Sequence, residues 1–161
     1  MIKAIIFDFD GVLVESAQIK TEAFKIIFSK WKDKVDEIVT YHRLNMGVSR
    51  YVKFRYIYEN ILKEPFSETT GKKLGEKFSE LVVEKIRLVP FVDGVLEFME
   101  ENHKEYMLFI ASGTPQEELE DIVKFKGIEK YFIGVFGTPA SKTEIIKNII
   151  ISYSLNPREI I

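Results

Sequence analysis

The stretch from Met1 to Ser16 reads MIKAIIFDFDGVLVES and decides how the chain is expected to fold. Its first half is a run of β-branched and aromatic residues, which is typical of a short strand buried on both faces of a parallel sheet. The run ends at two aspartates, Asp8 and Asp10, followed by Gly11, which allows the backbone to turn sharply. We therefore predict a strand over residues 1–7 that presents carboxylates at its C-terminal end.

Two later segments repeat this pattern of an apolar run followed by small polar residues. Residues 107–111 read MLFIA and end at Ser112, and residues 133–136 read IGVF and end at the tripeptide GTP. A signal for the start of a helix follows each run. Thr114 offers an N-cap hydroxyl ahead of a proline, and Ser141 opens a capping box in SKTE.

The spacing of apolar residues predicts how the chain is organised. Strands alternate with helices over residues 93–101, 115–126 and 142–154, which predicts an α/β fold with a parallel sheet covered by helices. Residues 16–87 break the alternation, because they show only four helical stretches, roughly 16–30, 33–44, 49–62 and 67–86. We therefore predict a core domain of residues 1–15 and 88–161, interrupted by an inserted helical domain of residues 16–87.

Composition narrows the class of protein. The 161 residues are 46% hydrophobic and carry a formal net charge of −2, so no global charge attracts nucleic acid or anionic lipid. The absence of cysteine excludes a disulfide framework and cysteine-ligated zinc. No apolar run approaches the roughly 18 residues of a membrane span. We expect a soluble, cytoplasmic protein with neither nucleic acid nor a membrane as partner.

The polar residues that follow the strands are the candidate functional site, because ligands of parallel sheets bind beyond the carboxyl ends of the strands. Asp8 and Asp10 would repel each other there unless a cation lies between them. With no cysteine and two histidines in the chain, Mg²⁺ held by oxygen is favoured over zinc. Ser112 and the Gly113 amide would cradle phosphate oxygens, and Lys142 supplies a compact positive charge.

Each of these residues also has an ordinary structural interpretation. An isolated Asp-x-Asp is often a turn or a helix cap. Ser112 taken alone is typical of a turn, and Lys142 taken alone is typical of an exposed helix start. What favours a site is their order, since each follows a successive strand.

The sequence resembles a known family at these same positions. The stretch IIFDFDGVLVES resembles the first motif of the haloacid dehalogenase (HAD) superfamily, in the branch of β-phosphoglucomutase and phosphoglycolate phosphatase. Ser112 is similar to the second motif, and Lys142 within TPASKTE to the third. The helical insertion resembles the α-helical cap of the family, and GVSR, which ends at Arg50, is similar to a cap segment of the mutase-like members. The resemblance implies a Rossmann-like core with a cap.

The resemblance also implies an activity, that of a Mg²⁺-dependent phosphatase acting on a small phosphorylated metabolite through an aspartyl-phosphate. Asp8 would attack phosphorus and bind the metal, while Asp10 would protonate the leaving alcohol and face the metal with its carbonyl. Ser112 and Gly113 would bind phosphate and Lys142 would neutralise charge. Arg50 of the cap would contact the substrate.

Several alternatives stay open at this stage. A sugar phosphomutase is one, because Arg50 resembles the arginine with which mutases grip phosphate, although Lys20 stands where a mutase would carry histidine. Another is a module that binds phosphate esters without turnover. A receiver-like phosphoacceptor domain would use a similar residue set, but the inserted helices speak against it. Asp10 argues against dehalogenation, since dehalogenases of the superfamily lack this second acid.

The family's fourth motif, an apolar strand followed by further metal-binding acids, would begin near Ile160 and Ile161, where the sequence stops. We therefore expect a C-terminally incomplete core with weakened Mg²⁺ binding, and activity of this chain is left open. The strand Ala4–Phe7 would then expose one edge, which predicts a homodimer through that edge or poor solubility. If the tail at Ile160–Ile161 folds across this edge, the edge is covered and no longer predicts a homodimer.

Overall fold

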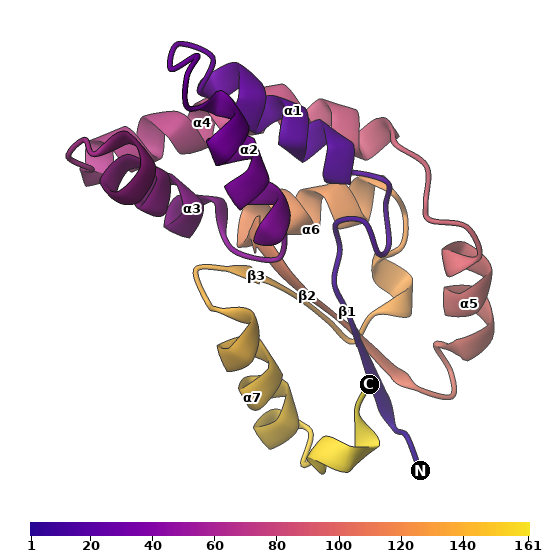
Figure 1. Ribbon diagram of the computed structural model, residues 1–161. Helices are drawn as coiled ribbons and strands as arrows, with labels where there is room; N and C mark the ends of the chain where they lie inside the picture. The colour runs from indigo at the N-terminus through magenta and orange to yellow at the C-terminus, as the bar shows by residue number, and fades with distance from the viewer. The chain divides into compact units, whose positions relative to one another are not determined.

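The computed structural model describes residues 1–161, and the chain divides into two compact units (Figure 1). The first, which we name the core unit, comprises Met1–Glu15 and Val89–Ile161. The second, the helical unit, comprises Ser16–Leu88. None of the helices is both long and apolar enough to cross a lipid bilayer.

The core unit is built on a parallel sheet, which confirms the predicted fold class. Its strands are β1 (Ala4–Phe7), β2 (Met107–Pro115) and β3 (Gly134–Thr138), in the spatial order β1-β2-β3. Ala4 pairs with Met107, and Phe109 pairs with Gly134. Because all three strands run in the same direction, the residues that follow them meet at one edge of the sheet.

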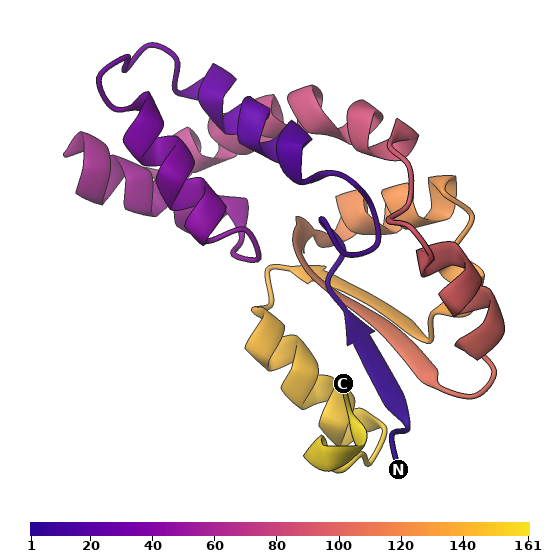
Figure 2. The same cartoon turned by 45° about the vertical axis from the view of Figure 1, so that its right-hand side comes forward.

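The C-terminal tail lies along the outer edge of β1 (Figure 2). Ile160 forms a parallel bridge with Ala4, and the Ile6 amide donates to the Ile161 carbonyl at 2.8 Å. The Lys3 amide donates to the Glu159 carbonyl, also at 2.8 Å. The outer edge of β1, which we expected to be exposed, is therefore paired with the tail from Lys3 to Ile6. The predicted homodimer is not tested, and an exposed β1 edge is no longer a reason to expect it.

Helices cover both faces of the sheet (Figure 1). On one face lie α5 (Val95–Asn102) and α6 (Gln116–Phe125), and on the other lies α7 (Lys142–Ser152). Two short 3₁₀ helices complete the unit, Glu129–Tyr131 and Pro157–Glu159. Alternate residues of each strand face opposite layers, so the apolar cluster under α7 combines the side chains of Ala4, Phe109, Ala111, Ile145, Ile149 and Leu155.

Both helices begin within one residue of the predicted positions, but only one of the two predicted helix caps is confirmed. Ser141 forms the complete capping box with Glu144 at the start of α7. At α6, however, β2 continues to Pro115, which occupies the N-cap position, and Thr114 makes no capping bond. The reason is that Pro115 pairs with Thr138 of β3, so this segment is strand. The Thr114 hydroxyl points to Asp10 and not to the first turn of α6.

The helical unit contains four α-helices around an aromatic core. They are α1 (Ala17–Ile27), α2 (Val35–Leu44), α3 (Arg50–Tyr56) and α4 (Glu68–Leu88). A π-helical segment, Ile57–Leu62, continues α3. The core is formed by fully buried rings, with Phe24 in contact with Phe28, Phe54 and Phe78.

The two segments through which the chain leaves and re-enters the core unit are bound to each other. Val14 forms an antiparallel bridge with Phe91, and the Glu15 amide donates to the Pro90 carbonyl at 3.2 Å. The Lys126 ammonium donates to the Val89 carbonyl at 2.6 Å. Burial lowers the pKa of Lys126 below its ordinary value. These contacts anchor both segments within the core unit.

We predict that Ser141→Ala destabilises the protein by about 1 kcal/mol, because the first turn of α7 loses its cap. The measurement is urea unfolding followed by circular dichroism, and Ser152→Ala at the exposed C-terminal end of the same helix is the matched control. Equal midpoints for the two variants would contradict the role of the cap.

The same cap predicts a dependence on pH. Hydrogen bonds from the Ser141 amide and hydroxyl lower the pKa of Glu144 below its ordinary value of 4.5. A lowered folded-state pKa stabilises the fold above the unfolded-state value, and this stabilisation is lost as the pH falls through the folded-state pKa. The difference in urea midpoint between the wild type and Ser141→Ala should therefore shrink from about pH 7 to about pH 3. A difference that stays constant over this range would rule out the carboxylate contribution.

Candidate functional site

The structure brings Asp8 and Lys142 into direct contact. Asp8 immediately follows β1, and Lys142 is the first residue of α7. The Lys142 ammonium lies 2.7 Å from Oδ2 of Asp8, and both side chains are about one third exposed (31% and 30%). The Phe9 amide donates to Oδ1 of Asp8 at 2.7 Å. Both oxygens of this carboxylate are thus oriented by donors, while the site stays accessible to solvent.

A second set of contacts joins Asp10 to the end of β2. The Thr114 hydroxyl donates to Oδ2 of Asp10 at 3.3 Å, and the Thr114 amide donates to the Ser112 hydroxyl oxygen at 3.1 Å. Ser112 and Thr114 are each 1% exposed. Gly113 lies between them in β2. The Asp10 carboxylate after β1 and the Ser112 hydroxyl within β2 are therefore bridged by one residue, Thr114, for which the sequence predicts a helix cap.

The turn after Asp10 has the conformation that the glycine was expected to provide. Gly11 has φ of 74°, in the left-handed region that disfavours side chains. Its amide donates to the Val14 carbonyl at 2.8 Å, and Asp10 bridges with Val14. This loop folds back on itself directly after the two carboxylates and fixes the backbone that carries Asp10.

A cavity of about 270 Å³ adjoins the ion pair. Asp8 and Lys142 supply its charged wall. Its remaining lining is apolar and comes from β1, β2, α7 and the C-terminal tail: Ile6, Phe7, Ala111, Ile146, Ile160 and Ile161. Polar groups in such a partly apolar surrounding interact more strongly than they would in bulk water.

The donor set at this edge fits Mg²⁺ better than a transition metal. No group of three or more histidine, cysteine, aspartate or glutamate side chains is arranged to hold a metal ion. The carboxylates available are Asp8 and Asp10. Mg²⁺ is commonly bound by one or two carboxylates together with water and substrate phosphates, so this donor set is compatible with Mg²⁺ and too small for a closed zinc site, and Mg²⁺ binding stays a prediction.

Arg50, the expected substrate residue, is the first residue of α3 in the helical unit. Its guanidinium donates to the Ser79 hydroxyl at 2.8 Å and lies 4.4 Å from the centre of the Phe78 ring. The side chain is 4% exposed. These contacts fix Arg50 against α4, and its role towards a substrate stays a prediction.

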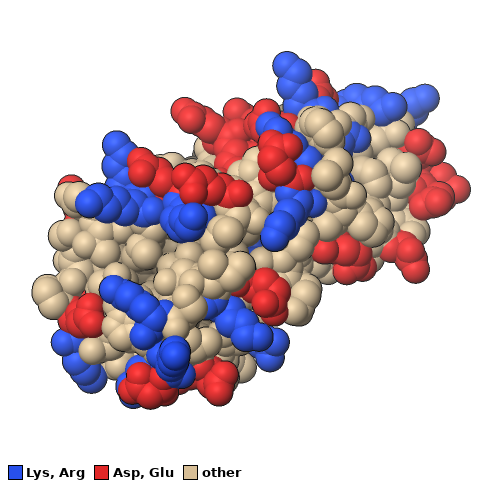
Figure 3. Space-filling view, turned by 90° about the horizontal axis from the view of Figure 1, so that it is seen from above, with Lys and Arg blue, Asp and Glu red and all other residues tan.

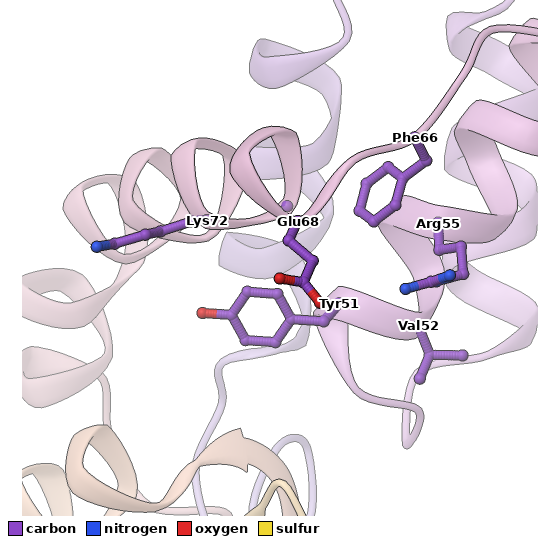
Figure 4. Close-up of a pocket in the computed structure, with 7 residues that line it drawn as sticks. Tyr51, Val52, Arg55, Phe66, Glu68 and Lys72 are labelled. Atoms are coloured by element: carbon purple, nitrogen blue, oxygen red, sulfur yellow. The ribbon is translucent and has the colours of Figure 1, made fainter.

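The helical unit contains a larger cavity of about 510 Å³, lined by α3, by Phe66 and by the first turns of α4 (Figure 4). Its wall carries the aromatic rings of Tyr51 and Phe66, and its charged residues are of both signs, with Arg55 and Lys72 beside Glu68. On the face of the molecule shown in Figure 3, acidic and basic side chains are also mixed. This cavity contains none of the predicted site residues.

The model of the family described as haloacid dehalogenase-like hydrolase matches residues 5–161. A phosphorylated carbohydrates phosphatase from Thermotoga maritima is 29% identical over 136 residues, which cover 84% of this chain and 61% of that relative. The chain thus spans less than two thirds of the length of this relative.

Two solved structures illustrate the likeness in fold. β-Phosphoglucomutase from Clostridium difficile superposes with a TM-score of 0.78 at 20% identity, covering 99% of this chain and 74% of that one. CbbY from Rhodobacter sphaeroides in complex with phosphate gives a TM-score of 0.73 at 17% identity, covering 100% and 76%.

We predict that Gly137→Ala destabilises the protein by about 1–3 kcal/mol, because close packing at this position leaves no room for a methyl group. A Cβ there would lie 2.4 Å from the Thr114 carbonyl and 3.0 Å from the Gln116 amide, which are backbone atoms that cannot rotate away. Gly71→Ala is the control, since its nearest obstacle is the movable Phe66 ring at 3.0 Å. Thermal unfolding of both variants gives the comparison, and equal stability of Gly137→Ala and the wild type would refute the close approach.

Proposed function

The chain belongs to the haloacid dehalogenase-like hydrolase family, and on that basis we propose that it hydrolyses phosphate monoesters of small metabolites, phosphorylated carbohydrates in particular. The observation that carries the proposal is the contact between Asp8 and Lys142, with a second acid, Asp10, two residues after Asp8 and hydrogen-bonded to Thr114 of β2. A nucleophile, an acid and a cation at one edge of the sheet are the groups that phosphoryl transfer to a carboxylate requires.

In the proposed reaction Asp8 is the nucleophile. One of its carboxylate oxygens forms a bond to phosphorus while the bond from phosphorus to the ester oxygen breaks. The departing oxygen takes a proton from the Asp10 carboxyl, and the ionised Asp10 later removes a proton from the water that hydrolyses the aspartyl-phosphate. Lys142, at 2.7 Å, keeps Asp8 oriented and offsets part of the negative charge that gathers around phosphorus.

Ser112 and Gly113 are proposed to bind the phosphoryl oxygens. The Ser112 oxygen accepts from the Thr114 amide, which leaves the Ser112 hydroxyl hydrogen to donate to phosphate. Mg²⁺ bound by the Asp8 carboxylate and the Asp10 backbone carbonyl would supply further positive charge to the phosphoryl group. Phosphate binding by Ser112 and Gly113 thus complements the roles of Asp8 in attack, Asp10 in proton transfer and Lys142 in charge balance.

We extend the proposal to the helical unit, which would act as the cap that selects the leaving group and excludes water during transfer to Asp8. Arg50 is the candidate contact to the substrate there. A phosphatase is favoured over a phosphomutase because Lys20 occupies the position where mutases of this family would carry histidine.

The direct test measures hydrolysis of p-nitrophenyl phosphate with and without Mg²⁺. We expect turnover that a chelator abolishes and added Mg²⁺ restores, and a loss on the order of 1,000-fold or more in Asp8→Asn, because an amide is not a nucleophile. Asp93→Asn changes an exposed acid of the core unit and serves as the matched control. Turnover that Asp8→Asn leaves intact would overturn the mechanism. Binding of phosphate esters without turnover would instead support a binding module.

A further inference from the structure

We propose that Thr114 is a positioning residue that holds Asp10 and Ser112 in one fixed arrangement, so that proton transfer and phosphate binding are aligned. The effect of Thr114 on turnover rests on the proposed function. Its effect on the side-chain geometry of Asp10 rests on the structure alone. It is not suggested by the sequence, in which Thr114 precedes a proline in the manner of a helix cap.

The contacts of Thr114 connect two strands at the site. Its hydroxyl donates to Oδ2 of Asp10 at 3.3 Å, and its amide donates to the hydroxyl oxygen of Ser112 at 3.1 Å. A carboxylate on a short side chain can rotate about two bonds, and a donor on one oxygen selects one orientation. The Thr114 hydroxyl therefore favours the orientation in which Oδ2 of Asp10 faces β2.

Thr114 is itself held rigidly, which is what a positioning residue requires. It lies in the extension of β2, and the next residue, Pro115, pairs with Thr138 of β3. The Gln116 side chain locks this extension, because its amide donates to the Val135 carbonyl at 2.8 Å and its oxygen accepts from the Gly137 amide. Gly137 lacks the methyl group that would collide with the Thr114 carbonyl.

The type of residue at this position agrees with such a role. Thr114 is 1% exposed, and a hydroxyl that deeply buried is stabilising only when it is hydrogen-bonded. Threonine is stiff at χ1 because it is β-branched, so its hydroxyl is pre-oriented at a lower entropic cost than that of serine. Valine has nearly the same shape without the donor, which makes it the informative substitution.

Two variants and a control test the role in turnover. We expect Thr114→Val to lower kcat about tenfold or more and to change KM less than about twofold, because the misdirected carboxyl affects proton transfer and not phosphate binding. Thr114→Ser should regain most of kcat. Thr138→Val removes a hydroxyl from the end of the neighbouring strand and should match the wild type. Urea unfolding of each variant checks that it is folded.

A second measurement does not depend on turnover. Three-bond couplings from the backbone to Cγ of Asp10, measured by NMR on labelled protein, report its χ1 rotamer. The chain has six aspartates, and the loss of one signal in Asp10→Asn assigns the resonance. We expect a single staggered rotamer in the wild type and in Thr114→Ser, and averaged couplings in Thr114→Val.

The outcomes separate the alternatives. Unchanged kcat and unchanged couplings in Thr114→Val would overturn the proposal. Equal loss in the serine and valine variants would also overturn it, since that result indicates packing and not the hydroxyl. A wild-type chain without turnover would refute the proposed function alone, and the couplings would then decide the positioning role.

Discussion

Parallel pairing of β1 with β2 and of β2 with β3 is the constraint on which the rest of the structure depends. It carries residues that are far apart in the sequence to one edge of the sheet, because parallel strands all end on the same side. Two acids after β1 would repel each other there. The Lys142 ammonium at 2.7 Å from Asp8 offsets that repulsion, and the capping box of α7 places this lysine at the first turn of its helix.

Much of this fold could be predicted from the sequence, because its elements are encoded locally. The apolar runs before Asp8 and before Ser112 predict strands, of which β2 is largely buried and β1 is half-buried apart from Ala4, and Ser141 with Glu144 predicts a helix start. The end of β2 could not be predicted in this way. Thr114 and Pro115 have local preferences for a helix start, but pairing of Pro115 with β3 and the side-chain bonds of Gln116 decide in favour of strand.

Some residues of the site could likewise be predicted from local sequence, and others depend on tertiary contacts. Asp8 and Asp10 follow β1 and Ser112 lies in the last part of β2, so the topology places all three towards the same edge of the sheet. The bridging hydroxyl of Thr114 depends on a strand extension and on the close approach of Gly137, which are tertiary features without a local signal. A sequence pattern can show which chemistry meets at an edge of a sheet, but it does not show which side chain holds the others in place.

The pairing of Ala4 with Met107 has a consequence for how the molecule is assembled. The whole helical unit, Ser16–Leu88, lies between these partners in the chain, so closing the first ladder means ordering the ends of a very long loop. The ladder between β2 and β3 joins strands much closer in sequence, such as Phe109 with Gly134, and contacts between near neighbours generally form sooner. We therefore expect the apolar strand β1 to pair after β2 and β3 have paired, and until then its unpaired backbone is open to aggregation.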